Sequence, residues 1–228
     1  MTERKLSPRG GFDKALRGEF DRTLRGEFER ALAVHAGAFG VSLGEEERAR
    51  LSEYFALVSA WNGRLHLVAP CPPAEFAVRH VLESMLALRF IGEGATVVDV
   101  GSGAGLPVVP CLAVRDDLKA VLVESSQKKA VFLREALARL GRQDSARVVA
   151  KRFEKLEPPE ADCLTCRALE RFTEVLPHLL AWASHIRTLL LFGGQSLREK
   201  LLLVGLSFEA VHVPESERRF LFVVKRGG

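Results

Sequence analysis

From residue 95 to the end of the chain, short apolar runs alternate with longer stretches in which apolar residues recur every three or four positions. The short runs predict seven strands, at 95–100, 119–124, 146–151, 162–168, 187–192, 208–213 and 220–226. The longer stretches predict helices at about 105–114, 126–141 and 173–185 and from about 195. This alternation is typical of an α/β protein with a mostly parallel sheet that is covered on both faces. The short polar connection at 214–219 predicts an antiparallel hairpin at the edge of the sheet.

The chain before residue 93 has a helical pattern throughout. Residues 45–61 begin with three glutamates and then place Leu51, Phe55 and Val58 on one face of a helix. Residues 72–90 begin with proline and predict a second helix, with apolar positions at Phe76, Val81, Met85 and Leu88. We therefore expect a helical cap over 41–92 and a sheet domain over 93–228.

A short repeat occupies the first 40 residues, which we expect to form an N-terminal arm. Its three units, FDKALRGE, FDRTLRGE and FERALAVH, each carry a phenylalanine followed four residues later by a leucine. A helix would place each such pair on one face. Gly18 and Gly26 would each weaken that helix by roughly 1 kcal/mol relative to alanine. The pattern predicts either a marginal amphipathic arm that docks on the body or on a partner, or a frayed tail.

Composition excludes several classes of protein. The 228 residues are 47% hydrophobic and 27% charged, as in globular domains. No apolar run approaches the length of a membrane span, and the N-terminal MTERKLSPRGG lacks the apolar core of a signal peptide. We therefore expect a cytoplasmic protein without membrane contact. Its four cysteines, which have no regular spacing, are expected to be reduced thiols: Cys71, Cys111, Cys163 and Cys166.

The positive charge of the chain is concentrated in one segment. The whole chain has a net charge of +4 and an isoelectric point near 9.0. Residues 125–155 contain nine basic and three acidic residues, a net charge of +6. The segment is either a contact surface for an anionic partner or a solvated helix face.

The first expected strand leads into a loop with glycines at alternate positions. Asp99 lies near the end of that strand, and Gly101, Gly103 and Gly105 follow. In an open parallel sheet, ligands bind at the carboxyl ends of the strands near a topological switch point. Glycine lets the chain turn tightly and lets a ligand approach the backbone closely. The sequence therefore predicts a ligand site at this loop.

The spacing of the loop indicates which ligand it binds. A dinucleotide loop has the pattern G-x-G-x-x-G, whereas here the third glycine comes one residue early and Leu106-Pro107 follow. Glu124 ends the next expected strand, where a carboxylate can accept both ribose hydroxyls of a nucleoside. Together these features predict a nucleoside cofactor without a pyrophosphate, namely S-adenosylmethionine.

Three segments of the sheet domain resemble one family. DVGSGAGLPVVP, LVESSQKKAVFLREALARLG and TCRA are similar to the ribosomal RNA small subunit methyltransferase G family, also called glucose-inhibited division protein B. In the cap, SAWNGRLHLVAP and VRHVLESM resemble the same family, so the likeness covers about 41–226. It implies a class I S-adenosylmethionine-dependent methyltransferase with a Rossmann-like sheet over 93–228. The implied activity is methylation of guanine N7 in 16S ribosomal RNA or the 30S subunit, by an enzyme expected to be a monomer.

The resemblance also implies roles for individual residues. Glu124 would hold the ribose of the cofactor, Phe153 and Glu154 would lie against the adenine, and Gly103 and Gly105 would shape the loop. The cofactor-binding set that it implies is Asp99, Gly101, Gly103, Gly105, Leu106, Glu124, Phe153, Glu154 and Arg167. The chain departs from the family pattern at five positions, His66, Val68, Glu83, Phe153 and Gly193. The last of these stands where the family often has lysine, which bears on RNA affinity and target choice.

The implied reaction requires little acid–base chemistry. Guanine N7 carries a lone pair and no proton, so alignment and exclusion of water can supply the catalysis. Arg167 is the expected catalytic residue, through contact with guanine O6, a phosphate or the cofactor carboxylate; the alternative is a structural ion pair. The residues expected to contact RNA are Arg79, His80, Lys128 and Lys129. His80 could equally be a helix histidine packed at a domain junction.

Other side chains are interpreted as structural. Cys163 and Cys166 lie three positions apart on an expected strand and so point to opposite faces, which argues against a metal site. Trp61 and Trp182 are expected in the core. Two other functions stay open: a methyltransferase for a small molecule or a protein, and a non-catalytic ribosome-binding protein with a relic pocket.

Overall fold

All seven expected strands are present in the computed structural model, which describes residues 9–167 and 172–226. Their ends differ from the predicted ones by no more than two residues. The strands are β1 Thr96–Val100, β2 Lys119–Val123, β3 Ala146–Val149, β4 Cys163–Arg167, β5 Thr188–Gly193, β6 Glu209–His212 and β7 Phe220–Lys225. They form one sheet in the order β3-β2-β1-β4-β5-β7-β6.

The order of the strands creates a switch point beside β1. Strands β1 to β5 are parallel, and β1 pairs with β2 on one side and with β4 on the other. The connections that follow β1 and β4 therefore diverge, and a crevice forms at the carboxyl ends of these two strands. The expected edge hairpin is confirmed, because β7 runs antiparallel to both β5 and β6.

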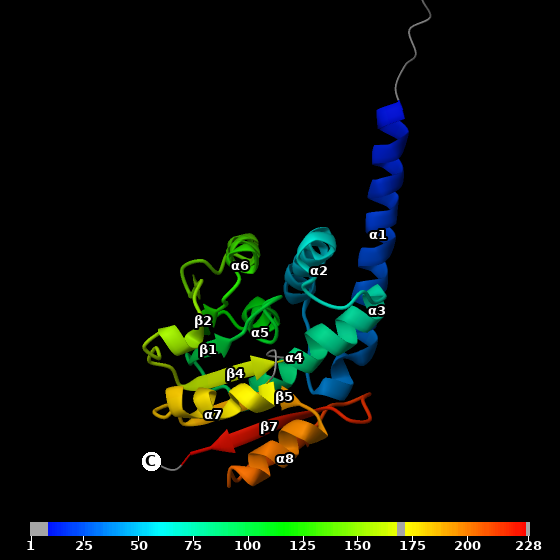
Figure 1. The fold of residues 1–228 in the computed structure, drawn as a ribbon. Helices are drawn as coiled ribbons and strands as arrows, with labels where there is room; N and C mark the ends of the chain where they lie inside the picture. The colour runs from blue at the N-terminus through cyan, green and yellow to red at the C-terminus, as the bar shows by residue number, and fades with distance from the viewer. Residues whose placement is uncertain (1–8, 168–171, 227–228) are drawn as a thin grey trace, which may run out of the picture.

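Helices cover both faces of the sheet (Figure 1). Helices α5 (Val108–Val114) and α6 (Gln127–Arg139) pack on one face, and α7 (Phe172–Trp182) and α8 (Gln195–Leu203) pack on the other. Strand residues an odd number of positions apart point to opposite faces of the sheet. Cys163 and Cys166, three positions apart on β4, are both buried, and they lie in separate apolar clusters as expected. Helix α5 begins at Val108 and not at 105, because the glycine loop continues through Leu106 and Pro107.

The N-terminal repeat forms most of one long helix. Helix α1 (Arg9–His35) is followed by the short turn η1 (Ala36–Phe39) and by α2 (Glu45–Leu65). Phe28 and Leu32 of the third repeat unit are fully buried, and the Phe28 ring stacks on Phe55 at 4.6 Å. This unit therefore docks on the body, and the alternative prediction of a frayed tail is wrong for this unit. The first two units form the N-terminal half of α1, which extends away from the sheet (Figure 1); the side chains of Phe12, Leu16 and Phe20 lie outside the described residues.

The second expected cap helix, at 72–90, is helical but irregular. It comprises α3 (Pro73–Phe76), a π-helical segment η2 (Ala77–Leu82), α4 (Glu83–Met85) and a 3-10 segment η3 (Leu86–Phe90). The expected helix is therefore confirmed, and its bonding departs from that of a regular α-helix in the π and 3-10 segments. The His80 carbonyl in the π segment accepts hydrogen bonds from Ser84 Oγ and from the Arg167 guanidinium. Such π segments often occur at functional sites.

The division of the chain at residues 40 and 92 stays a prediction. One apolar cluster contains Phe28 of the expected arm, Leu51 and Phe76 of the expected cap, and Leu122 and Leu133 of the sheet domain. The core is therefore continuous across both boundaries. No helix within the two described ranges is long and apolar enough to cross a membrane.

Candidate active site

The glycine loop has the tight backbone that the sequence predicted. Gly101, Gly103 and Gly105 have φ angles of 74°, 53° and 88°, a region that disfavours residues with a side chain. A Cβ atom on Gly105 would also lie 2.4 Å from Val109 Cγ2. The loop is tied to the end of β2, because the Gly101 and Ser102 amides both donate to the Val123 carbonyl at 2.9 and 3.2 Å.

Glu124 joins this loop to the start of helix α6. One carboxylate oxygen accepts a hydrogen bond from the Gly103 amide at 2.8 Å, and the other accepts one from the Ser126 amide at 2.7 Å. Ser126 is the N-cap of α6 and accepts in turn from the Lys129 amide. Glu124 is buried, and its carboxylate links the glycine loop after β1 to the start of the helix after β2.

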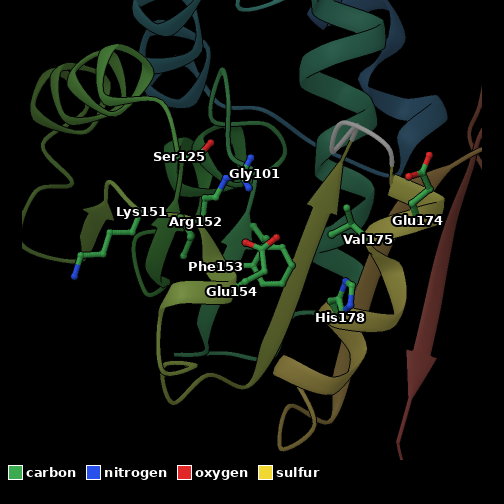
Figure 2. Close-up of a pocket in the computed structure, with 11 residues that line it drawn as sticks. Gly101, Ser125, Lys151, Arg152, Phe153, Glu154, Glu174, Val175 and His178 are labelled. Atoms are coloured by element: carbon green, nitrogen blue, oxygen red, sulfur yellow. The ribbon is translucent and has the colours of Figure 1, made fainter.

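A cavity of about 440 Å³ opens at this end of the sheet (Figure 2). Its lining comes from the ends of β1 and β2, from the segment after β3, and from α7. Figure 2 shows Val175 and His178 of α7 across the cavity from Phe153 and Glu154, while the Lys151 side chain extends away from the other labelled residues. The lining residues are Val100, Gly101, Val123, Ser125, Lys151, Arg152, Phe153, Glu154, Glu174, Val175 and His178.

Phe153 forms an apolar wall of this cavity. It begins the short turn η4 (Phe153–Lys155) and is 5% exposed, and its ring meets Trp182 edge-on at 5.6 Å. Trp182 also donates from Nε1 to the Leu156 carbonyl at 2.7 Å. Trp182 therefore fixes the turn that carries Phe153. Trp61 packs against the other apolar cluster, so both tryptophans pack against the core as expected.

The structure brings only part of the predicted cofactor set to the cavity. Gly101, Phe153 and Glu154 line it. Gly103, Gly105, Leu106 and Glu124 belong to the loop and strand end beside it, and Asp99 and Arg167 lie elsewhere. Sequence reasoning missed the residues from α7 and the residue after Glu124, namely Ser125, Glu174, Val175 and His178. The one feature of the sequence that could have pointed to these residues is their position just after strands β2 and β4.

Asp99 lies beneath the loop and is fully buried. Its Oδ1 accepts a hydrogen bond from Thr165 Oγ1 at 2.7 Å, while its Oδ2 has no hydrogen-bond partner. Burial raises the pKa of Asp99 from its ordinary value of 3.8 to about 7, although the nearby hydroxyls of Ser102 and Thr165 oppose this shift. Asp99 therefore supports the loop from below and does not face the cavity.

Arg167 points toward the cap and not into the cavity. Its guanidinium donates to the Arg79 carbonyl at 2.6 Å and to Ser84 Oγ at 3.2 Å, and it lies 3.5 Å from the Glu83 carboxylate. Arg219, at the start of β7, lies 2.7 Å from the other oxygen of Glu83. This geometry favours the structural ion pair over contact with the base or the cofactor, while the catalytic role stays a prediction.

The residues expected to contact RNA lie in two separate places. Lys128 is exposed and Lys129 partly exposed on the first turn of α6. Arg79 is exposed on η2 and forms an ion pair with Glu75. Burial, followed by the charges of Arg167, Arg79 and Arg219, lowers the pKa of His80 to about 3. His80 is therefore neutral at physiological pH and would meet RNA through a hydrogen bond rather than through charge.

Comparison with known proteins identifies the family. The profile of the rRNA small subunit methyltransferase G family matches residues 47–212. The chain belongs to this family. A ribosomal RNA small subunit methyltransferase G from Xanthomonas euvesicatoria pv. vesicatoria (strain 85-10) is 38% identical over 86% of this chain and 94% of its own. A second one, from Gluconobacter oxydans (strain 621H), is 40% identical over 62% of this chain and 70% of its own.

The fold agrees with that of solved structures. A protein in the NADB-Rossmann superfamily from Streptococcus agalactiae superposes with a TM-score of 0.50 at 18% identity, over 64% of this chain and 68% of its own. The expected α/β fold, a Rossmann-like methyltransferase fold with an N-terminal helical extension, is thereby confirmed.

The structure shows what surrounds two of the residues that depart from the family pattern, Gly193 and Phe153. A Cβ atom on Gly193 would lie 2.6 Å from Leu197 Cδ2 and 3.0 Å from Leu197 Cβ, so a lysine at this position would require Leu197 to move. Phe153, which replaces a small residue, is held in place by Trp182. Among the described residues, no group of three or more histidines, cysteines, aspartates or glutamates could hold a metal ion.

Proposed function

We propose that this member of the rRNA small subunit methyltransferase G family transfers a methyl group from S-adenosylmethionine to N7 of a guanine in 16S ribosomal RNA. The observation that carries the proposal is the cavity beside the glycine loop, at the switch point of a sheet whose chain belongs to this family. The names of the relatives specify small-subunit ribosomal RNA, and the atom N7 comes from the family resemblance.

The residues at the cavity suit a nucleoside with an amino-acid tail. A volume of about 440 Å³ is in the usual range for small-molecule sites. Phe153 offers an apolar face for the adenine, and Glu124 and Ser125 offer oxygen atoms at the end of β2 for the ribose hydroxyls. Gly101 and Gly103 leave the backbone accessible to the tail. When bound, S-adenosylmethionine supplies a methyl group activated by its sulfonium.

The protein's own contribution to the reaction is alignment and charge. Guanine N7 attacks through a lone pair and loses no proton, so the site needs no general base. Glu154 and Glu174 both line the cavity. Their negative charge suits a cationic donor and a product guanine that carries positive charge. The side of α7 that carries Val175 and His178 would exclude water from the reacting groups.

The RNA is proposed to approach across the carboxyl ends of β1 and β4. Arg79, Lys128 and Lys129 would contact phosphates, and Lys151 and Arg152 place two further positive charges at the cavity. A ribosomal RNA substrate, either 16S RNA itself or the 30S subunit, would place the protein in the cytoplasm. We keep the expectation that it acts as a monomer.

Ligand-induced stabilisation tests the cofactor. S-adenosylhomocysteine at about a hundredfold excess over Kd should stabilise the fold by roughly 2.7 kcal/mol. The melting temperature should rise with this ligand and should not change with NADH. Stabilisation by NADH alone would overturn the proposal. If neither ligand stabilises the fold, the result would favour the alternative of a non-catalytic protein whose cavity no longer binds a cofactor.

A further inference from the structure

The glycine loop has a contact that reaches it from outside the sheet. Tyr54, on α2, donates a hydrogen bond from its hydroxyl to the Ala104 carbonyl at 2.8 Å. Ala104 lies between Gly103 and Gly105, at the turn of the loop. Both partners are buried, with Tyr54 1% and Ala104 4% exposed. The bond therefore joins the N-terminal helices to the cofactor loop without competition from water.

The loop depends on contacts of this kind for its shape. Three glycines leave its backbone with more conformational freedom than other residues would. Hydrogen bonds restrain it at other points: the Gly103 amide to Glu124, and the Gly105 amide to the Ser102 carbonyl at 2.6 Å. Tyr54 restrains the turn itself. Without the Tyr54 hydroxyl, the buried Ala104 carbonyl would face an apolar ring. A buried acceptor that loses its donor lowers the stability of the folded state.

The Tyr54 ring is itself held firmly. Its centroid lies 6.2 Å from that of Phe76, and Phe76 lies 5.3 Å from Phe55, which stacks on Phe28. Burial raises the pKa of Tyr54 well above its ordinary value, so the phenol stays protonated and remains a donor. Tyr54 is also the only tyrosine in the sequence.

We infer that Tyr54 is a positioning residue for the cofactor: its hydroxyl fixes the Ala104 carbonyl and thereby holds Gly103 and Gly105 in the shape that receives S-adenosylmethionine. The inference rests on the proposed function, since it takes this loop as the cofactor site. Tyr54 does not touch the cavity, so it acts through the backbone of the loop.

The variant Tyr54→Phe tests the inference with little change in packing. The dissociation constant for S-adenosylhomocysteine, measured by calorimetry, should rise about tenfold. Ser52→Ala is the matched control, because Ser52 is buried on the same helix and donates to Glu29 at 2.6 Å, away from the loop. Both variants should lower the melting temperature, but only Tyr54→Phe should weaken binding. Equal affinity in Tyr54→Phe and the wild type would overturn the inference.

Two measurements keep the test decisive if Tyr54→Phe is poorly folded or the ligand does not bind. In the wild type, 13C-labelled tyrosine gives a single NMR signal, that of Tyr54. This signal should shift when S-adenosylhomocysteine is added and should not shift with NADH. An unshifted signal in a protein that binds S-adenosylhomocysteine would overturn the inference. Amide exchange at Gly103 and Gly105 should be faster in Tyr54→Phe than in Ser52→Ala. If the wild type binds no S-adenosylhomocysteine, the proposed cofactor fails, while these exchange rates still decide whether Tyr54 holds the loop.

Discussion

Arg167 and Glu83 form a buried ion pair across 3.5 Å, with side chains 11% and 4% exposed. The pair connects the carboxyl end of β4 to the irregular helical segment of the cap, where Arg167 also bonds to backbone carbonyls. Arg219 lies against the same carboxylate from the start of β7. Burial raises the pKa of Glu83, and the nearby guanidiniums of Arg167, Arg219 and Arg79 oppose that rise. Two strands and the cap thus depend on one buried acid.

The replacement Arg167→Lys should destabilise the fold. Lysine keeps the charge but loses the planar fork that reaches several acceptors, and hydrogen bonds to charged groups contribute about 1.5–3 kcal/mol. We expect a loss of that order in the free energy of unfolding, measured with urea, and unchanged affinity for S-adenosylhomocysteine. Arg219→Lys, on the same carboxylate, should cost less because Arg219 is more exposed. A sharp fall in single-turnover methyl transfer without a loss of stability would instead assign Arg167 to the guanine.

Asp99 should make the stability depend on pH. Its pKa is about 7 in the folded protein and has an ordinary value of 3.8, so the fold holds the proton more tightly than the unfolded chain does. Its stabilising contribution is full below about pH 4 and is lost as the pH rises through 7, by roughly 4 kcal/mol in all. Asp99→Asn should remove this dependence. A difference in unfolding free energy between wild type and variant that is the same at pH 5 and pH 8 would contradict the assignment.

Glu124→Gln should weaken cofactor binding. The glutamate accepts hydrogen bonds from two backbone amides, and glutamine can offer only one oxygen to them, so the Gly103 end of the loop would loosen. We expect the dissociation constant for S-adenosylhomocysteine to rise about tenfold, while the fold persists. Glu135→Gln, in an exposed pair with Arg139 on α6, is the control and should bind normally. Normal binding by Glu124→Gln would remove Glu124 from the cofactor site.

Much of this site could be predicted because its signals are local. The apolar runs locate the strands, the three glycines have the positive φ angles that only glycine tolerates well, and Glu124 ends β2 beside them. These features depend on a few neighbouring residues. Periodicity also placed Cys163 and Cys166 on opposite faces of the sheet.

The remainder could not be predicted because it depends on pairs far apart in the sequence. The Arg167 side chain turns toward the cap because Glu83 and the carbonyls of the π segment lie there, and no pattern near Arg167 encodes them. The spacing of Val175 and His178 indicates one side of a helix but not that this side faces a cavity. Tyr54 meets Ala104 fifty residues away, through the packing of the cap.

The lysines at the start of α6 should determine part of the salt dependence of RNA binding. Each neutralised phosphate contributes roughly −0.7 to the slope of log K against log salt on single-stranded RNA. Replacing both Lys128 and Lys129 by alanine should therefore flatten the slope by about 1.4. Arg198→Ala with Lys200→Ala, on α8 at the opposite face of the sheet, should leave it unchanged. Equal slopes for wild type and the Lys128/Lys129 variant would make these lysines a solvated helix face.

The central claim is that this protein methylates guanine N7 in small-subunit ribosomal RNA. The most direct measurement is transfer of the labelled methyl group of S-adenosylmethionine to 16S RNA, to 30S subunits and to a mixture of small metabolites, followed by mass spectrometry of the digested nucleosides. The account predicts label in 7-methylguanosine and in no other nucleoside, from the free RNA or from the subunit. Label on another base, on a small molecule alone, or on nothing at all would contradict it.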